Sequence, residues 1–375
     1  MATTTTPPVL GPRALGRATL ARQLLLRRTP RSELSVKGAV EHLVGLQAQN
    51  VTPPYHALAA RLADFDPGEL SALMASRDVA RLVTLRSTLH THSADDCLAL
   101  RPLLQPGAPD RELRAFRSGL TGVDLDRLRV RARELVEAEP RTMKQLREEL
   151  GAAWPHADPF ALSVAARCVL PLVQITPRGL WGRSGQVALT TAEHWFGRPA
   201  GPAAAPEDLL RRYLAAFGPA SVKDLQTWSG LTRTREVFER LRPELAVFQD
   251  ERGVELFDLP DAPRPPEDTP APPRLLPEYD NLLLSHADRS RVVADDRHRA
   301  LTWRGNQSFP TLLVDGLLAG VWRLTGTGAR AILTVSPFGP LSRAVREEVA
   351  AEAELTLTRL SAAASYDIRF GPLPE

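Results

Sequence analysis

The sequence predicts a mostly helical α+β protein, in which three tandem winged helix-turn-helix units precede a small β-barrel-like domain. Groups of short helix signals, each followed by a β-rich hairpin signal, recur three times along residues 13–262. Such a group is typical of the winged variant of the helix-turn-helix. A proline-rich, charged stretch at residues 258–274 then leads into a last segment in which strand signals dominate.

The first unit, with a connecting helix, is predicted within residues 13–137, after a Thr/Pro-rich tail at residues 1–12 that we expect to be flexible. Its helix signals are apolar side chains at helical spacing, a serine at the start of one segment and a proline at the start of the next. These segments are residues 15–28, 32–46, 53–62 and 66–78. Residues 79–93, VARLVTLRSTLHTHS, alternate in polarity and predict the wing.

The same order recurs in the second and third units, which we place at residues 138–200 and 201–262. In the second unit, a threonine-capped helix and another helix precede a glycine-rich hairpin at residues 175–191. In the third unit, GPASVKDLQTWSGL is a strong helix-turn-helix signal, because Ser221 is placed to cap a helix and Trp228 with Gly230 to form the turn. A hairpin around DERG follows it.

The C-terminal part begins after a stiff linker, which we bound at residues 263–274. Residues 275–375 contain apolar strand signals joined by glycine turns, and VDGLLAGVW is a hairpin candidate. One long helix follows from residue 342. We therefore expect a β-barrel-like domain with a C-terminal helix.

Composition sets broad limits on location and partners. The N-terminus lacks the features of a secretory signal, no apolar run is long enough to span a bilayer, and there are only two cysteines, Cys97 and Cys168. We therefore expect a cytoplasmic protein with no membrane association. The net charge is +3, and lysine occurs only at Lys37, Lys144 and Lys223. This arginine bias permits nucleic-acid binding, although GC-rich coding is the favoured explanation.

Most catalytic motifs are missing from the sequence. His90 and His92 share a face of the predicted strand, but a zinc site usually needs three or four ligands. There is no G-x-x-x-x-G-K phosphate loop, no G-x-S-x-G elbow, and no evident partner for Cys97. We therefore expect neither a metal nor a cofactor.

The stretch GLQAQNVTPPY places Gln47 and Gln49 directly after a helical run. Pro53 disfavours helical geometry before it, so the helix is expected to end near Leu46. Residues two apart in an extended segment point the same way, and both carboxamides then converge on one water or one base edge. The alternative is that they cap the helix or bond to the turn backbone. The residues alone favour this alternative.

Taken in order, LVGLQAQNVTPPYHALAARL, LVTLRSTLHTHSADD, GPASVKDLQTWSGL, LLPEYDNLLLSHADRSRVV and VDGLLAGVWR resemble the bacterial winged-helix DNA glycosylases of the AlkZ and AlkX type. The likeness covers about residues 10–370. It implies three tandem winged helices and a β-barrel. One member of this family confers self-resistance on an antibiotic producer by unhooking azinomycin B crosslinks, and the likeness makes the same role a candidate here.

The family's catalytic motif is Gln-x-Gln, or Gln-x-Asp in one branch, and Gln47-Ala48-Gln49 matches the first form. The resemblance therefore implies catalytic roles for Gln47 and Gln49 in hydrolysing the N-glycosidic bond of N7-alkylated guanines, including interstrand crosslinks or bulky natural-product adducts. N7-alkylation makes the purine a good leaving group, so a neutral amide pair that positions water is sufficient. No lysine accompanies the motif, so we expect no lyase step.

The expected partner is double-stranded DNA carrying alkylated purines, bound by a monomer in a wide, basic channel. Candidate DNA contacts are Arg86, His90, Lys223, Arg233, Arg235, His286, Arg289 and Arg291. The alternative function is a winged-helix transcription regulator or architectural DNA-binding protein without catalysis. Three units in one chain without a clear dimerisation helix argue against a palindrome-reading regulator.

Overall fold

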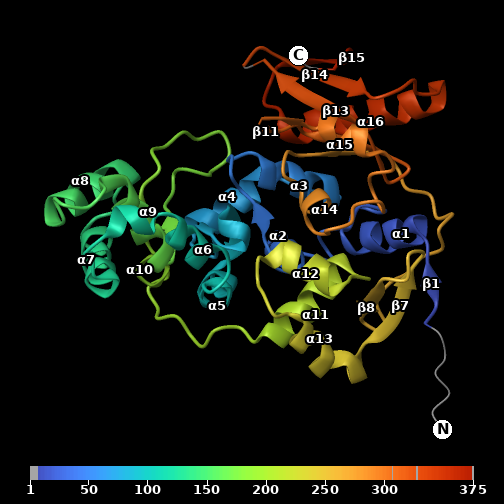
Figure 1. Cartoon of the computed structure of the whole chain (residues 1–375). Helices are drawn as coiled ribbons and strands as arrows, with labels where there is room; N and C mark the ends of the chain where they lie inside the picture. Colours follow the sequence, from blue (N-terminus) through green and yellow to red (C-terminus); the bar gives the residue numbers. More distant parts are fainter. Residues whose placement is uncertain (1–6, 306, 327, 374–375) are drawn as a thin grey trace, which may run out of the picture.

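The computed structural model describes residues 7–305, 307–326 and 328–373 and has the expected mostly helical α+β fold. Helices α7 to α10 form a lobe at one side of the molecule, α11 to α13 lie below the centre, and the C-terminal sheet lies at the opposite end (Figure 1). None of the described helices combines the length and apolarity that a bilayer span requires.

The first helical region follows the order helix, short strand, helix, helix, strand, strand. Its helices start where the sequence supplies caps: Ser35 accepts from Gly38 N at α2, and Asp66 accepts from Gly68 N at α4. Pro53 occupies the first turn of α3. The elements are α2 (Val36–His42), β2 (Leu46–Gln47), α3 (Pro53–Arg61), α4 (Pro67–Ala75), β3 (Val79–Val83) and β4 (Leu89–Ser93).

The same order recurs twice, with an isolated β-bridge in place of the first strand. In the second region, Arg141 bridges to Leu189, and in the third, Ala220 bridges to Phe257. The second region contains α7 (Leu125–Ala138), α8 (Met143–Ala153), α9 (Pro159–Val169), β5 (Leu172–Gln174) and β6 (Leu189–Thr191), and the third contains α11 (Pro206–Phe217), α12 (Val222–Ser229), α13 (Arg235–Leu241), β7 (Ala246–Asp250) and β8 (Glu255–Asp258). Helices α5 (Ala94–Leu104), α6 (Ala108–Ala115) and α10 (Ala192–Phe196) connect the regions.

The first two regions are joined by one continuous sheet. Its strand order is β2-β4-β3-β5-β6, and β3 pairs with β5 through Arg81 opposite Gln174. The β-rich segments of the two regions are therefore parts of one antiparallel sheet. Any site on this sheet is built from both regions at once.

Helix α1 (Pro12–Arg22) links the third region to the C-terminal part. Val9–Leu10 form β1, which pairs with β7, so the flexibility expected for residues 1–12 does not extend to residues 9–12; residues 1–6 lie outside the described residues. The buried Arg22 guanidinium forms a two-point ion pair with Asp258, at 2.5 and 2.7 Å. Arg17 donates to the Thr269 carbonyl at 2.6 Å, so the proline-rich linker is packed against α1.

The C-terminal part is an open sheet and not the expected barrel. Its order is β15-β14-β13-β12-β9, and within the described residues the two edge strands do not pair with each other. Helix α16 (Arg343–Leu360) packs on the sheet through Val349, Ala353 and Leu357. The strands are β9 (Arg274–Leu276), β12 (Thr311–Val314), β13 (Leu317–Thr325), β14 (Arg330–Pro337) and β15 (Ser365–Phe370), and the small elements before β12 are α14 (Asn281–Leu284), α15 (Asp296–Leu301), β10 (Trp303–Arg304) and β11 (Gln307–Ser308).

Replacing Asp258 tests the link between α1 and the third region. Asp258→Ala leaves Arg22 buried without its counter-ion, so we expect the free energy of unfolding to fall by about 3–5 kcal/mol. Urea unfolding followed by circular dichroism measures this change. Glu33→Ala removes the exposed partner of Arg27 and serves as the control, with a change below about 1 kcal/mol. An equal fall in the free energy of unfolding for Asp258→Ala and Glu33→Ala contradicts the role given to the buried ion pair.

Candidate active site

Gln47 lies at the end of β2 and is almost buried. It pairs in register with His90 on β4, and its side chain is only 8% exposed. Arg86 Nη2 donates to Gln47 Oε1 at 3.3 Å. Arginine is only a donor, so this contact identifies which end of the carboxamide faces Arg86. The amide orientation of Gln47 is therefore defined by its neighbour.

Gln49 has different surroundings. Strand pairing continues to Ala48, whose amide donates to the Leu89 carbonyl at 2.8 Å, and the chain then bends at the exposed Gln49. Gln49 lines a cavity of about 200 Å³ with Arg81 and Arg178. The register puts Gln47 on the opposite sheet face, the one that carries His90 and Leu82. The shared direction expected for the two glutamines is therefore not confirmed, because the bend interrupts strand alternation.

The backbone before Gln47 is fixed by a strained helix end. The Gly45 amide donates to the Val40 carbonyl at 2.9 Å, the pattern of a Schellman motif at the end of α2. Val44 has φ 52° and Gly45 has φ 91°. A β-branched residue at positive φ is rare, so surrounding contacts must hold it. A Cβ on Gly45 lies 2.2 Å from the His92 ring, which leaves room only for glycine.

Asn281, far along the chain, supplies one of these contacts. Its Nδ2 donates to the carbonyls of Gly45 at 2.8 Å and Leu43 at 3.3 Å. The preceding Asp280 forms a fully buried, two-point ion pair with Arg61 of α3, at 2.9 and 2.8 Å. The start of α14 is thus held against α3 while it binds the backbone that leads into Gln47.

The β3–β4 turn brings the third region to the site. Arg86 and Ser87 both have positive φ, at 55° and 59°, a conformation that costs on the order of 1–3 kcal/mol each. Arg86 Nη1 donates to the Trp228 carbonyl of α12 at 2.5 Å. Burial, followed by the charge of Arg289, lowers the pKa of Arg86 to about 10. The guanidinium stays charged near neutral pH and connects Gln47 to the third region.

Three predicted DNA contacts are buried and belong to the protein core. His90 is 0% exposed and its Nδ1 donates to the Thr88 carbonyl. His286 is 1% exposed between Ser285 and the Phe217 carbonyl. Arg291 is 5% exposed and donates to Thr19 Oγ1 and the Pro219 carbonyl. These positions contradict direct DNA contact, because each side chain is enclosed by the fold.

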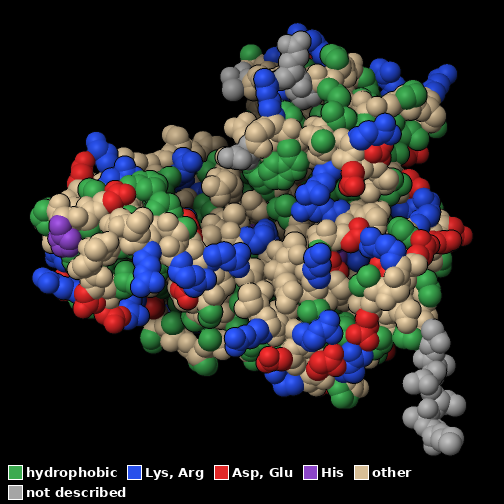
Figure 2. Space-filling view, in the orientation of Figure 1, with side chains coloured by type: hydrophobic (Ala, Val, Ile, Leu, Met, Phe, Trp, Pro, Cys, Tyr) green, Lys and Arg blue, Asp and Glu red, His purple; other side chains and the backbone are tan. Residues whose placement is uncertain are grey.

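The other predicted contacts are accessible. Lys223 is exposed on α12, and Arg233 and Arg235 are exposed at the start of α13. Arg289 is half-buried and close enough to Arg86 to lower its pKa. In Figure 2, Lys and Arg side chains border the hollow between the α7–α9 lobe and the rest of the molecule. The sequence reasoning missed Arg81, whose position inside the alternating VARLV strand gave only a weak signal.

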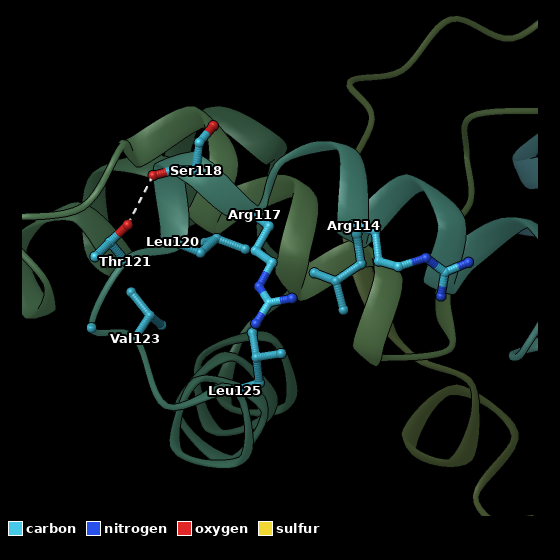
Figure 3. Close-up of a pocket in the computed structure, with 9 residues that line it drawn as sticks. Arg114, Arg117, Ser118, Leu120, Thr121, Val123 and Leu125 are labelled. Atoms are coloured by element: carbon cyan, nitrogen blue, oxygen red, sulfur yellow. Dashed lines mark hydrogen bonds between the residues drawn. The ribbon is translucent and has the colours of Figure 1, made fainter.

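A larger cavity, of about 810 Å³, lies between α6, the turn at Arg117–Leu120 and α7. Figure 3 shows Arg117 extending toward Leu125, and Thr121 donating to the Ser118 carbonyl. Its lining includes none of the predicted site residues. Cavity size therefore does not locate the chemistry here, and the Gln47–Gln49 segment remains the candidate site.

Comparison with known proteins identifies the family. The model of the AlkZ-like DNA glycosylase family matches residues 40–358. The chain belongs to the AlkZ-like DNA glycosylase family. It is 24% identical over 346 residues to the interstrand DNA cross-link repair glycosylase of Streptomyces sahachiroi, covering 86% of this chain and 90% of that protein. The solved structure of Streptomyces sahachiroi DNA glycosylase AlkZ shares the fold, with a TM-score of 0.72 at 22% identity over 97% of this chain and 100% of that one.

This membership decides between the two functions considered from the sequence. The AlkZ-like chain is a DNA glycosylase, and the non-catalytic regulator is set aside. The resemblance seen in the sequence motifs is confirmed at the level of the family. The identity with the Streptomyces sahachiroi protein is low, so the likeness does not equate the two enzymes.

Substituting Gly45 tests the geometry of the motif. Gly45→Ala introduces a methyl group into the space of the His92 ring and strains a residue at φ 91°. We expect Tm to fall by several degrees, since such strain costs on the order of 1–3 kcal/mol. Differential scanning calorimetry gives the change. Gly253→Ala is the control, because Gly253 also has positive φ, 77°, but its added Cβ meets nothing within 4 Å. A fall in Tm for Gly45→Ala that is no greater than the fall for Gly253→Ala contradicts the steric argument.

The buried histidines predict acid-sensitive folding. Burial lowers the pKa of His56 and His92 to about 4, and also lowers that of His90 and His286. An unfolded histidine has a pKa near 6.5, so below that pH the unfolded state binds more protons and stability falls. We expect a loss of roughly 5 kcal/mol between pH 7.5 and 5.5, measured by urea unfolding. His56→Leu should reduce the number of protons taken up on unfolding by about one. An unchanged slope of the unfolding free energy against pH contradicts this expectation.

Proposed function

We propose that this enzyme is a monofunctional glycosylase that hydrolyses the N-glycosidic bond of N7-alkylated guanines in duplex DNA, including interstrand crosslinks. The observation that carries the proposal is the pair of neutral carboxamides at Gln47 and Gln49, one held by an arginine and the other exposed. Such a pair suits a bond that breaks readily and needs little more than a positioned water.

Gln49 holds the water in this proposal. Its exposed carboxamide offers an acceptor oxygen, whereas the Gln47 oxygen already accepts from Arg86. The C1′–N9 bond breaks with its electron pair moving to N9, which neutralises the cationic purine. The water oxygen adds to C1′ and releases a proton to solvent. Gln47, on the opposite sheet face, acts as a positioning residue for this segment, because its oxygen accepts from Arg86, which in turn donates to the Trp228 carbonyl.

The three recurring regions act as winged helices around an intact duplex. Each has the order helix, strand or bridge, helix, helix, strand, strand, and the exposed Lys223, Arg233 and Arg235 lie on the helix-turn-helix of the third region. A crosslinked guanine is tethered to the opposite strand and cannot rotate fully into a tight pocket. A broad cradle accommodates such a target, and a relative bearing the name interstrand DNA cross-link repair glycosylase supports this substrate class.

Carboxamide removal tests the catalytic assignment. We expect Gln49→Ala and Gln47→Ala to reduce single-turnover cleavage of an N7-methylguanine duplex about 100-fold or more, the usual effect of losing one preorganised polar group. Abasic sites are revealed by alkali, and duplex affinity is measured at fixed salt. Gln249→Ala, on β7, is the matched control. Full activity in both site variants overturns the proposal.

Substrate charge gives a separate test. We expect release of N7-methylguanine and unhooking of an N7-guanine interstrand crosslink, with no release of unmodified guanine. The reason is that only the cationic purine departs as a neutral molecule. Product analysis on the three duplexes under identical conditions measures this selectivity. Excision of uncharged bases at similar rates contradicts the mechanism.

A further inference from the structure

The cavity beside Gln49 contains an unusual pair of arginines. It lies on one face of the sheet, where β3, β5 and the segment after β5 meet, so both of the first two regions build it. Arg81 from β3 is 2% exposed, and its Nη2 donates to the Ala48 carbonyl at 2.7 Å. Its Nε and Nη1 are buried and have no hydrogen-bond partner within the described residues.

Arg178 comes from the segment after β5 and lies close enough to disfavour the charge on Arg81. Its Nη1 donates to the Gly185 carbonyl at 3.2 Å, and its buried Nε lacks a partner in the described part of the chain. The described lining includes no aspartate or glutamate. A third lining arginine, Arg167, already pairs with Glu112.

Two other buried arginines, Arg22 and Arg61, have carboxylate counter-ions. Arg22 is neutralised by Asp258 and Arg61 by Asp280, in each case by a two-point ion pair. A buried charge without a counter-ion is costly, and burial lowers the pKa of Arg81 to about 10. The cavity lining therefore presents buried donors and positive charge, and no carboxylate among its described residues neutralises them.

We propose that Arg81 and Arg178 bind a backbone phosphate of the DNA next to the target nucleotide. Arginine is the residue best suited to phosphate oxygens. The volume of about 200 Å³ holds a phosphate group and several waters. The buried Ser87 Oγ, which has no hydrogen-bond partner among the described residues, adds a further donor on the lining. The buried Gln174 Oε1 on the same lining is an acceptor and takes a water.

Charge also decides against the lesion base as the occupant. An N7-alkylguanine is cationic, so two arginines without a counter-ion repel it, whereas they attract the phosphate. Because Gln49 borders the same cavity, a bound phosphate places the attached sugar beside the carboxamide that orients the water. This assignment rests on the proposed function, and it gives Arg81 and Arg178 the role of positioning residues.

The test replaces single phosphates with neutral methylphosphonates on each side of an N7-methylguanine. For the wild-type protein, we expect one position to weaken binding about 10-fold, which corresponds to about 1.4 kcal/mol. Arg178→Gln, a partly exposed site, should weaken binding to unmodified duplex by a similar factor and lower the salt slope by about 0.9. When the methylphosphonate occupies the position that weakens wild-type binding, Arg178→Gln should lose no further affinity.

Arg343→Gln is the charge-matched control, since Arg343 is exposed at the start of α16. It should retain the full methylphosphonate effect at every position. The proposal is overturned if, at every position, the affinity losses caused by Arg178→Gln and by the methylphosphonate add together. A Tm rise with inorganic phosphate that disappears in Arg178→Gln, without methylphosphonate coupling, identifies a free-anion site and also overturns it. The coupling between Arg178→Gln and the methylphosphonate is measured as binding and does not depend on cleavage. It therefore tests the phosphate site separately from the proposed function, which is tested by the cleavage activity of Gln49→Ala.

Discussion

The buried ion pair between Arg61 and Asp280 is the interaction on which the candidate site depends. Neither side chain is accessible, and both oxygens of the carboxylate are engaged by the guanidinium. Asp280 also accepts from the Leu282 amide, which starts the short helix α14 and leaves Asn281 facing the backbone of Gly45. Buried ion pairs contribute little net stability compared with apolar packing. The value of this pair lies in position: it connects residues more than 200 apart and holds the chain that leads into Gln47.

Buried arginines in this enzyme differ in whether a carboxylate neutralises them. Arg22 and Arg61 are buried with carboxylates, whereas Arg81 is buried with an arginine neighbour and the half-buried Arg86 lies near Arg289. On the proposed mechanism, the positive charges at Arg81 and at Arg86 serve the same reaction. The polyanionic duplex supplies the counter-charge, and cations near the purine favour its departure as a neutral molecule. Carboxamide oxygens are suited to the sugar, where positive charge develops. A carboxylate would pair with the arginines and remove the phosphate site.

The sequence predicted the features that depend on local rules, and it failed where tertiary packing decides. Ser221 caps α12 as predicted, whereas the serine cap expected at the start of residues 32–46 lies three residues later, at Ser35. The order of elements followed from such signals. The barrel was wrong because the packing of α16 across the sheet has no local signature. His90, His286 and Arg291 look like ordinary surface residues in a basic loop or wing, but the fold encloses them. The divergence of Gln47 and Gln49 arises from one bend, which period-two alternation cannot anticipate.

The shared sheet explains why the candidate site cannot be assigned to one region. Gln49 follows the first strand of the first region, but its cavity is completed by Gln174 and Arg178 from the second, and Arg86 contacts α12 of the third. Hydrogen bonds between β3 and β5 fix the first two regions to each other. On the proposed function, such a cradle positions the duplex by its backbone and brings the Gln49 carboxamide to the sugar, without requiring the base to leave the helix. This geometry suits the crosslinked guanine proposed as substrate, because the backbone of a tethered guanine is accessible while its rotation is blocked.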